Sequence, residues 1–238
     1  MLWDDYRAAL FDLDGVLTPT AEVHMRAWQL MFAGYFEVRG ITPAYSDADY
    51  FAYVDGKPRY DGVRTALASR GVVLPEGEPT DPPVAETVCG LGNRKNILVN
   101  RLLDEEGVAP YPGSVALLDH LAGRGIGVAV VSSSRNAPEV LVAAGLANRF
   151  TVVVDGSVAE TEGLAGKPAP DTFWYAAERL GAAKEDAVVL EDAVSGVRAG
   201  RAGGFGLVVG VDRGAGADAL REAGADVVVQ DLLELVER

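Results

Sequence analysis

The sequence predicts an α/β protein with a doubly wound parallel sheet and a helical domain inserted after the first strand. Short valine-rich runs alternate with amphipathic stretches through the second half of the chain. One further apolar run stands near the N-terminus, before a long helical region. Uninterrupted β-branched runs are typical of strands covered on both faces. Their alternation with helices is typical of a parallel sheet.

Six strands are expected. The first is AALFDLD, residues 8–14. The others are GVAVVSS (127–133), TVVVDG (151–156), AVVLED (187–192), FGLVVGV (205–211) and ADVVVQD (225–231). Helical patterns lie between them, such as residues 170–181, which carry a proline near the start and a glycine at the end.

Helical periodicity dominates between the first strand and the rest of the sheet. We therefore expect a core domain of residues 1–18 and 109–238 and a helical cap domain of residues 19–108. The segment LPEGEPTDPPVAE (74–86) is rich in proline, glycine and acid. It is expected to be an exposed loop and not a site.

The overall charge argues against two classes of partner. Thirty-five acidic residues against 21 Lys and Arg give a net charge of −14. This balance opposes binding to nucleic acid or to an anionic membrane. Cys89 is the single cysteine, so no intramolecular disulfide can form. Without a signal-peptide pattern or a membrane-spanning run, the expectation is a cytoplasmic protein, as a monomer or weak dimer.

Two carboxylates, Asp12 and Asp14, stand at the end of the first expected strand. Burying a pair of unpaired carboxylates is costly, because each loses hydration and the two repel. Ligands of open parallel sheets bind beyond the carboxyl ends of the strands. Ser132 and the Glu191–Asp192 pair stand at the same kind of strand end. This convergence favours a site over an ordinary acidic turn.

The residue types suggest distinct chemical tasks. Of Asp12 and Asp14, one could attack an electrophile and the other could move a proton. Glu191 and Asp192 offer hard oxygen ligands suited to Mg²⁺. Lys167 precedes a proline, so it is expected on a loop where it could neutralise anionic oxygens. The stretch 130–136 leads into Asn136-x-x-Glu139, an expected capping box and anion site.

In this order, the motifs resemble those of the haloacid dehalogenase superfamily, specifically its β-phosphoglucomutase-like branch. The residues that carry the resemblance are DLDGV (12–16), Ser132, Lys167 and EDAVSG (191–196). The resemblance covers essentially the whole chain, with the middle region as a helical cap.

The resemblance implies a role for each core residue. Asp12 would be the nucleophile, and Asp14 the general acid/base whose main-chain carbonyl also binds metal. Asp12, Glu191 and Asp192 would hold Mg²⁺ by their carboxylates, while Ser132 and Lys167 would bind the transferring phosphoryl oxygens. Dehalogenase members lack the second carboxylate, since a halide leaving group needs no proton. The presence of Asp14 therefore favours phosphoryl transfer over dehalogenation.

The segment TPTAEVHMRAW (18–28) matches the first cap segment of the branch. Thr20, His24 and Trp28 are spaced by four and form one helical stripe, and a second stripe consists of Val23, Ala27, Leu30 and Met31. One stripe is expected to pack in the cap core and the other to face the cleft. There Thr20 and Trp28 would contact the substrate, and His24 would assist Asp14 or the reacting hydroxyl. The alternative is a polar-face histidine beside a packed tryptophan.

Further substrate contacts follow from the resemblance. DGKPRYDG (55–62) supplies Arg59, expected to grip the non-reacting phosphate, and NRKN (93–96) supplies Lys95 and Asn96. The alternative for Arg59 and Lys95 is a solvated cap surface. The expected core-side contacts to the same sugar phosphate are Ser134, Arg135 and Asn136. Arg135 stands where mutases of the branch usually carry lysine, which keeps the charge but changes a point donor to a fork.

The leading prediction is Mg²⁺-dependent phosphoryl transfer on a hexose phosphate, through a phospho-aspartyl intermediate at Asp12. β-Phosphoglucomutase-like interconversion of β-glucose 1-phosphate and glucose 6-phosphate is the first choice. Hydrolysis of a sugar phosphate by the same intermediate is the second. The remaining alternatives are a non-enzymatic phospho-acceptor, which also uses an Asp, a Ser/Thr and a Lys around Mg²⁺, and a catalytically silent binding module.

Overall fold

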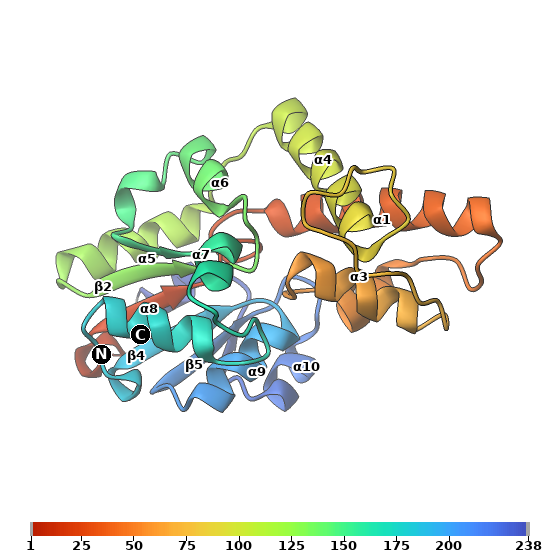
Figure 1. Ribbon diagram of the computed structural model, residues 1–238. Helices are drawn as coiled ribbons and strands as arrows, with labels where there is room; N and C mark the ends of the chain where they lie inside the picture. The colour runs from red at the N-terminus through yellow and green to blue at the C-terminus, as the bar shows by residue number, and fades with distance from the viewer. Residues whose placement is uncertain (1, 237–238) are drawn as a thin grey trace. The chain divides into compact units, whose positions relative to one another are not determined.

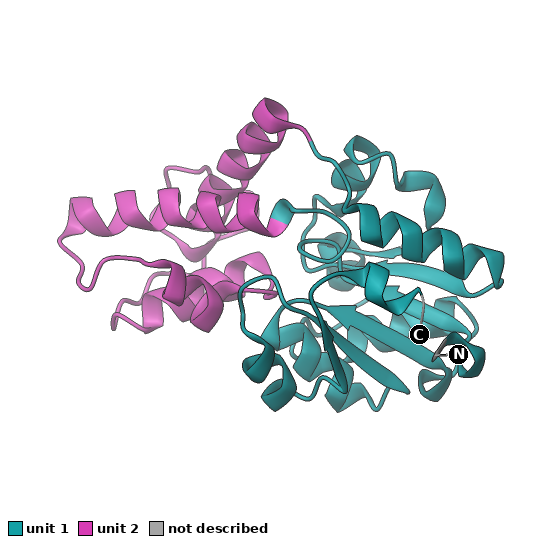
Figure 2. Cartoon of the chain, turned by 180° about the vertical axis from the view of Figure 1, so that it is seen from behind, with its two compact units in different colours: residues 1–20, 108–238 teal, residues 21–107 magenta. Residues whose placement is uncertain are grey.

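The computed structural model describes residues 2–236, and the chain folds into two compact units (Figure 2). The first unit comprises residues 1–20 and 108–238, and the second comprises residues 21–107. The first unit is built around a parallel sheet with helices, and the second is helical (Figure 1). The predicted α/β fold with an inserted helical region is confirmed.

The first unit contains a six-stranded parallel sheet in the order β3-β2-β1-β4-β5-β6. The strands are β1 (Ala8–Phe11), β2 (Gly127–Val131), β3 (Val152–Val154), β4 (Ala187–Glu191), β5 (Leu207–Val211) and β6 (Val227–Val229). Each lies inside one of the six predicted runs and is shorter than it. The runs overestimated the strands because their terminal Asp, Gly and Ser residues belong to the loops that leave the sheet.

The centre of the sheet is the place where its winding reverses. β1 pairs with β2 on one side and with β4 on the other, so Phe11 lies opposite both Val130 and Leu190. Strand order then runs outward in both directions from the β1–β4 pair. In doubly wound sheets, ligands bind beyond the carboxyl ends of the strands at such a point. Asp12 is the first residue after β1, and Glu191 is the last residue of β4.

Helices connect the strands of the first unit. They are α5 (Pro112–Gly123), α6 (Ala137–Ala143), α7 (Gly156–Thr161), α8 (Asp171–Arg179), α9 (Val194–Gly203) and α10 (Ala217–Ala223). Short 3₁₀ turns are η1 (Leu2–Asp5), η3 (Ala147–Arg149), η4 (Lys184–Asp186) and η5 (Leu232–Leu235). α8 and α9 pack on one face of the sheet, where Phe173 and Ala199 join the buried cluster of Leu10 and Val189. Apolar burial of this kind contributes roughly 25 cal/mol per Å² of covered area.

One predicted capping interaction is wrong. Asn136 is the residue before α6, but its side chain makes no capping hydrogen bond. Its φ and ψ are −93° and 7°, whereas an N-cap residue is typically extended. The Asn136 N–H instead donates to Ser134 Oγ at 3.2 Å. The serine-rich turn therefore organises the start of this helix in place of a capping box.

The second unit consists of α1 (Thr20–Arg39), α2 (Asp47–Asp49), a π turn η2 (Tyr50–Val54), α3 (Arg59–Ala68) and α4 (Val88–Glu106). Its core is aromatic: Phe32 stacks on Trp28 with ring centroids 5.4 Å apart and on Tyr45 at 4.9 Å. Within residues 2–236, every helix is too short or too polar to cross a bilayer.

The two stripes predicted on α1 do not separate as expected. Trp28 is buried in the aromatic core, although its stripe contains the polar Thr20 and His24. In the other stripe, Val23, Ala27 and Met31 are buried but Leu30 is 55% exposed. The prediction for Leu30 is wrong because spacing alone cannot say how wide the covered face of a helix is.

The segment predicted as an exposed loop is held in place along its length. Asn93 Nδ2 on α4 donates to the carbonyls of Pro79 at 3.0 Å and Asp81 at 2.9 Å, and Arg94 Nε donates to Pro83 O at 2.8 Å. Most residues of the segment are exposed, as expected. Their carbonyls nevertheless tie the segment to α4, the helix that carries Lys95 and Asn96.

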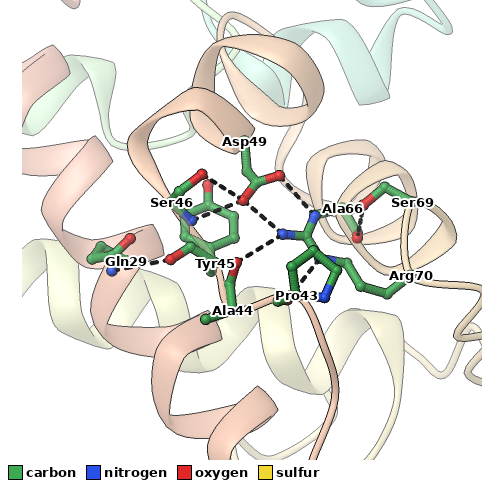
Figure 3. A network of polar contacts seen from close by, with 9 residues as sticks. All are labelled: Gln29, Pro43, Ala44, Tyr45, Ser46, Asp49, Ala66, Ser69 and Arg70. Atoms are coloured by element: carbon green, nitrogen blue, oxygen red, sulfur yellow. Dashed lines mark hydrogen bonds and ion pairs between the residues drawn. The ribbon is translucent and has the colours of Figure 1, made fainter.

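A buried ion pair holds the residues that follow α1 (Figure 3). Arg70 donates to both carboxylate oxygens of Asp49, at 2.8 and 2.6 Å, and Nη2 also donates to Ala44 O at 3.2 Å. Only 3% of the Arg70 side chain and 14% of the Asp49 side chain is exposed. The hydrogen bonds from Arg70, opposed by burial and helped by Ser46, lower the pKa of Asp49.

We expect Asp49→Asn to reduce the free energy of unfolding by about 3 kcal/mol at pH 7, because Arg70 would remain buried without its anion. The folded pKa of Asp49 lies below its unfolded value, so its stabilisation is complete above about pH 4 and is lost as pH falls through the folded pKa. Urea unfolding at pH 7 and pH 3 measures this. The difference between wild type and variant should be smaller at pH 3.

The exposed pair Asp218–Arg221 provides the control, since Asp218→Asn should change stability little at either pH. An Asp49→Asn penalty that is equal at pH 7 and pH 3 would contradict the assigned role of this carboxylate.

Candidate active site

Lys167 is the centre of a charged cluster at the carboxyl ends of β1 and β4. Its Nζ donates to Asp12 Oδ1 at 2.5 Å, to Glu191 Oε1, and to the carbonyl of Val131 at 2.9 Å. The ammonium also lies 5.0 Å from the ring centroid of Phe173. Lys167 is 3% exposed and Glu191 is fully buried. Three of the predicted core residues are therefore brought together, from segments distant in sequence.

The two strands explain why Asp12 and Glu191 are adjacent. Asp12 N–H donates to Leu190 O at 2.9 Å, which continues the β1–β4 ladder by one residue. Glu191 Oε2 accepts from Ala193 N–H at 3.0 Å. A Cβ at Gly196 would lie 1.8 Å from Glu191 Oε1, so the carboxylate needs the bare backbone of α9. The glycine of the EDAVSG motif thus makes room for the acid that begins it.

Burial and charge act in opposite directions on this cluster. Burial raises the pKa of Asp12, Lys167 lowers it and Asp14 raises it, with a net upward shift. Burial is also the largest influence on Glu191, and the net shift of its pKa is upward. Burial alone would lower the pKa of Lys167, but Asp12 and Glu191 outweigh it and the net shift is upward. The Lys167 ammonium therefore stays charged, and it is the one cation that Asp12 and Glu191 share.

Asp192 lies against the loop that carries Asp14. It is 7% exposed, and a Cβ added to Gly15 would come within 1.9 Å of Asp192 Oδ2. Gly15 also has a φ of +88°, in the left-handed region that favours glycine. The glycine after Asp14 is thus required twice, for its backbone conformation and for the close approach of a carboxylate.

Asp14 is held from the far side of its own loop. Thr20 Oγ1 donates to Asp14 Oδ1, and Thr20 and Thr18 share a hydrogen bond at 2.7 Å between their hydroxyl oxygens. Thr20 is 1% exposed. The structure thus places the Thr20 hydroxyl, expected to contact substrate, on the carboxylate expected to act as acid/base.

The serine-rich turn after β2 carries four of the predicted site residues, Ser132, Ser134, Arg135 and Asn136. Ser132 is 3% exposed, and its Oγ accepts from Ser134 N–H at 3.1 Å. Asn136 N–H donates in turn to Ser134 Oγ. Arg135 points to α7, where Nη2 is 2.8 Å from Glu160 Oε2. A substrate bound by Arg135 would therefore compete with or share this ion pair.

Within the helical unit, His24, Trp28 and Lys95 form one group. Lys95 Nζ lies 2.9 Å from His24 Nδ1 and 4.9 Å from the Trp28 ring centroid. Burial, then the charges of Lys95 and Arg59, lower the pKa of His24 well below its usual range. An ammonium can only donate, so Nδ1 is the acceptor and the neutral imidazole carries its hydrogen on Nε2. Trp28 supports Lys95 from the core.

Arg59 begins α3 and meets the last residue of the NRKN motif. Its Nη2 donates to Asn96 Oδ1 at 2.6 Å. Tyr60 OH donates to Asn93 Oδ1 at 3.1 Å on the same helix, α4. Neither Lys95, which is 4% exposed, nor the partly buried Arg59 is a solvated surface cation. The helical unit thus brings its predicted site residues into two contacting groups. These residues are His24, Trp28, Arg59, Lys95 and Asn96.

The donors near Asp12 suit a magnesium ion. Asp12 and Asp192 are nearly buried carboxylates, and hard oxygens are what Mg²⁺ binds. The main-chain oxygen of Asp14 is expected to join them. In the described range 2–236, no three His, Cys, Asp or Glu side chains are grouped closely enough to hold a metal unaided. Mg²⁺ is commonly bound by one or two carboxylates together with waters and substrate phosphate, so this arrangement fits. Glu191, the other expected ligand, would share its carboxylate with Lys167.

Several residues that organise this site were not indicated by the sequence motifs. The Val131 carbonyl could not be recognised, because main-chain acceptors leave no sequence signal. Phe173, under the Lys167 ammonium, was assigned only to a helix. Arg213, whose Nε donates to the Gly15 carbonyl at 2.9 Å, was also missed, although it follows the strand run at 205–211 and the strand-end rule that selected Ser132 would have found it.

Known proteins of one family resemble this chain over most of its length. The family model described as haloacid dehalogenase-like hydrolase matches residues 6–204. A β-phosphoglucomutase of Mycobacterium bovis is 51% identical over 239 aligned residues, covering 97% of this chain and 91% of the relative. A β-phosphoglucomutase of Bacillus subtilis is 32% identical, covering 96% and 91%. The crystal structure of β-phosphoglucomutase from Clostridium difficile superposes with a TM-score of 0.77 at 24% identity, covering 97% of this chain and 93% of that one.

Proposed function

Because the chain belongs to the haloacid dehalogenase-like hydrolase family, we propose that it is a Mg²⁺-dependent mutase of a hexose phosphate, converting β-glucose 1-phosphate to glucose 6-phosphate. The observation that carries the chemistry is the convergence of Asp12, Lys167 and Glu191 at the centre of the sheet. The 51% identity to a mycobacterial β-phosphoglucomutase supports the choice of reaction.

Asp12 would carry the phosphoryl group between two sugar oxygens. The 6-hydroxyl of β-glucose 1-phosphate attacks phosphorus on phospho-Asp12 and passes its proton to Asp14, which yields a bisphosphate and free Asp12. The sugar then turns around. Asp12 attacks the 1-phosphate, the phosphorus–O1 bond breaks, and Asp14 returns the proton to O1. Glucose 6-phosphate leaves, and the phospho-enzyme is restored.

The surrounding residues would bind and balance charge. Lys167 already donates to Asp12 and would also face a phosphoryl oxygen there, with Ser132 as a further donor. Mg²⁺, bound by Asp12, Glu191 and Asp192 with the Asp14 carbonyl, would neutralise negative charge on the transferring group. Thr20 orients Asp14. His24, with its Nε2 hydrogen, would donate to a sugar oxygen.

A mutase must also hold the phosphate that does not react and keep water from phospho-Asp12. Arg59 with Asn96 and Lys95 would bind the second phosphate, together with Ser134, Arg135 and Asn136. A guanidinium suits this task because it presents paired donors to phosphate oxygens. The helical unit would exclude water once the sugar phosphate is bound.

The test is incubation of the purified protein with β-glucose 1-phosphate, Mg²⁺ and a catalytic amount of β-glucose 1,6-bisphosphate. Glucose 6-phosphate is the expected product, and the α anomer is the control for anomer preference. Free phosphate without glucose 6-phosphate would reject the mutase and support a sugar-phosphate phosphatase. A stable phosphoprotein with no turnover of any sugar phosphate would support a phospho-acceptor.

Arg59→Ala should reduce mutase turnover by about 10- to 100-fold, the value of one or two charge-assisted hydrogen bonds. It should change hydrolysis of an aryl phosphate much less, since that substrate has no second phosphate. Coupled assay of glucose 6-phosphate and colorimetric assay of the aryl phosphate give the two rates. Arg64→Ala on the same helix is the control, because Arg64 pairs with Glu76 at the surface. Equal losses in both assays would exclude Arg59 as the distal-phosphate ligand.

A further inference from the structure

The loop that carries Asp12 and Asp14 presents three consecutive main-chain carbonyls to donors from distant parts of the first unit. The acceptors are Gly15, Val16 and Leu17, and the donors are Arg213 Nε at 2.9 Å, Ser114 Oγ at 2.6 Å and Tyr111 N–H at 2.9 Å, in that order. Two donors belong to the start of α5, and the third follows β5. The loop is thus fixed from outside as well as by its own turn.

Arg213 is the only one of these donors that is a charged side chain. Besides the Gly15 carbonyl, it donates from Nη1 to Gln230 O at 3.0 Å. Its guanidinium carbon lies 4.0 Å from the ring centroid of Tyr111. Two carbonyls and one ring therefore fix the plane of a rigid fork, which a lysine could not reproduce.

The surroundings of Arg213 do not explain it as a surface ion pair. Its partners within residues 2–236 are main-chain carbonyls and a ring, with no carboxylate among the ion pairs. Its remaining nitrogen, Nη2, is buried and has no hydrogen-bond partner in that range. A buried unsatisfied donor costs free energy that an apolar side chain of similar length would avoid. Among the described residues, Arg213 thus keeps one buried donor unpaired while two others hold main-chain carbonyls.

Asp12 and Asp14 depend on Arg213 to different extents. Asp12 is fixed by the sheet, through its bond to Leu190 O, and by Lys167. Asp14 lies beyond the sheet, immediately before the residue that Arg213 holds. Loss of Arg213 should therefore move Asp14 while leaving the nucleophile in place.

We propose that Arg213 is a positioning residue for Asp14: by holding the Gly15 carbonyl, it keeps the general acid/base at the distance that proton transfer requires. This inference rests on the proposed function, in which Asp14 gives and takes the proton of a sugar oxygen. A displacement of about 1 Å can cost roughly 10²-fold in rate, because proton transfer needs hydrogen-bond geometry.

The test compares a leaving group that needs a proton with one that does not. First-turnover phosphoryl transfer to Asp12 is measured from β-glucose 1,6-bisphosphate and from 2,4-dinitrophenyl phosphate, each with Mg²⁺. Arg213→Met should slow transfer from the sugar bisphosphate about 10²-fold and change dinitrophenolate release less than about threefold. Arg213→Lys, which can still reach one carbonyl, should fall between wild type and Arg213→Met.

The control is Arg201→Met, since Arg201 is exposed and 3.4 Å from its partner Asp226; both rates should match wild type. Equal slowing of both substrates, or no slowing of either, would overturn the inference, because a general structural defect does not distinguish leaving groups. If Arg213→Met fails to fold, the same comparison on Arg213→Lys decides. If the wild type transfers nothing from the sugar bisphosphate, the proposed function fails; the comparison with a simple alkyl phosphate then still tests Arg213.

Discussion

Asp12→Asn is expected to abolish turnover, with a loss of at least about 10⁴-fold, because an amide cannot take up the phosphoryl group. The fold should survive this change. Asparagine matches aspartate in size, the backbone bond to Leu190 is kept, and Lys167 retains Glu191 as its anion. Circular dichroism measures the fold, and incubation with a labelled, activated phosphate donor measures phosphoprotein. The wild type should become labelled, and Asp12→Asn should not.

Asp14→Ala is the matched control for this prediction. It removes the neighbouring carboxylate but leaves the nucleophile, so turnover of the sugar phosphate should fall while labelling by an activated donor persists. The main-chain carbonyl of residue 14 remains, so Mg²⁺ binding should change little. Substantial labelling of Asp12→Asn, or residual turnover near the wild-type rate, would contradict Asp12 as the nucleophile.

Lys167→Met is expected to lower both stability and activity. The variant would leave Asp12 and the fully buried Glu191 without their shared cation, and removal of one partner from a buried ion pair typically costs about 3–5 kcal/mol. Turnover by the folded fraction should fall by about 10²- to 10³-fold, because the ammonium would no longer stabilise charge on the transferring group. Urea unfolding and the mutase assay measure the two effects.

Lys184→Met is the control for charge removal. Lys184 is 45% exposed and lies 4.0 Å from Glu185, so its loss should leave stability and turnover nearly unchanged. A Lys167→Met protein as stable as the Lys184→Met protein would show that the carboxylates at β1 and β4 do not depend on Lys167.

The sheet could be predicted because its strands are covered on both faces. Valine-rich runs such as residues 187–192 have few other places in a folded chain, and all six became strands. Their ends were less predictable. Asp155, assigned to a strand, instead accepts from Ser157 and Val158 N–H as the N-cap of α7. Local capping competes with extension of a strand, and the sequence does not show which prevails.

The site could be predicted where side chains follow strand ends. Lys167 is different: only the resemblance placed it beside Asp12, because nothing in the GKPAPD loop indicates the direction of its side chain. Contacts made by main-chain atoms, such as the Val131 carbonyl, were beyond prediction. The burial of Trp28 was only the alternative prediction, since a stripe at spacing four does not reveal which neighbours cover it.

The most direct test of phosphoryl transfer through Asp12 is a crystal structure with Mg²⁺ and beryllofluoride, a mimic of a phosphoryl group on a carboxylate. We expect the beryllium to be bonded to an Asp12 carboxylate oxygen, its fluorines to lie within reach of Lys167 and Ser132, and the ion to be bound by Asp12, Glu191, Asp192 and the Asp14 carbonyl. A structure in which both groups are absent from Asp12 under saturating conditions would contradict the proposed chemistry.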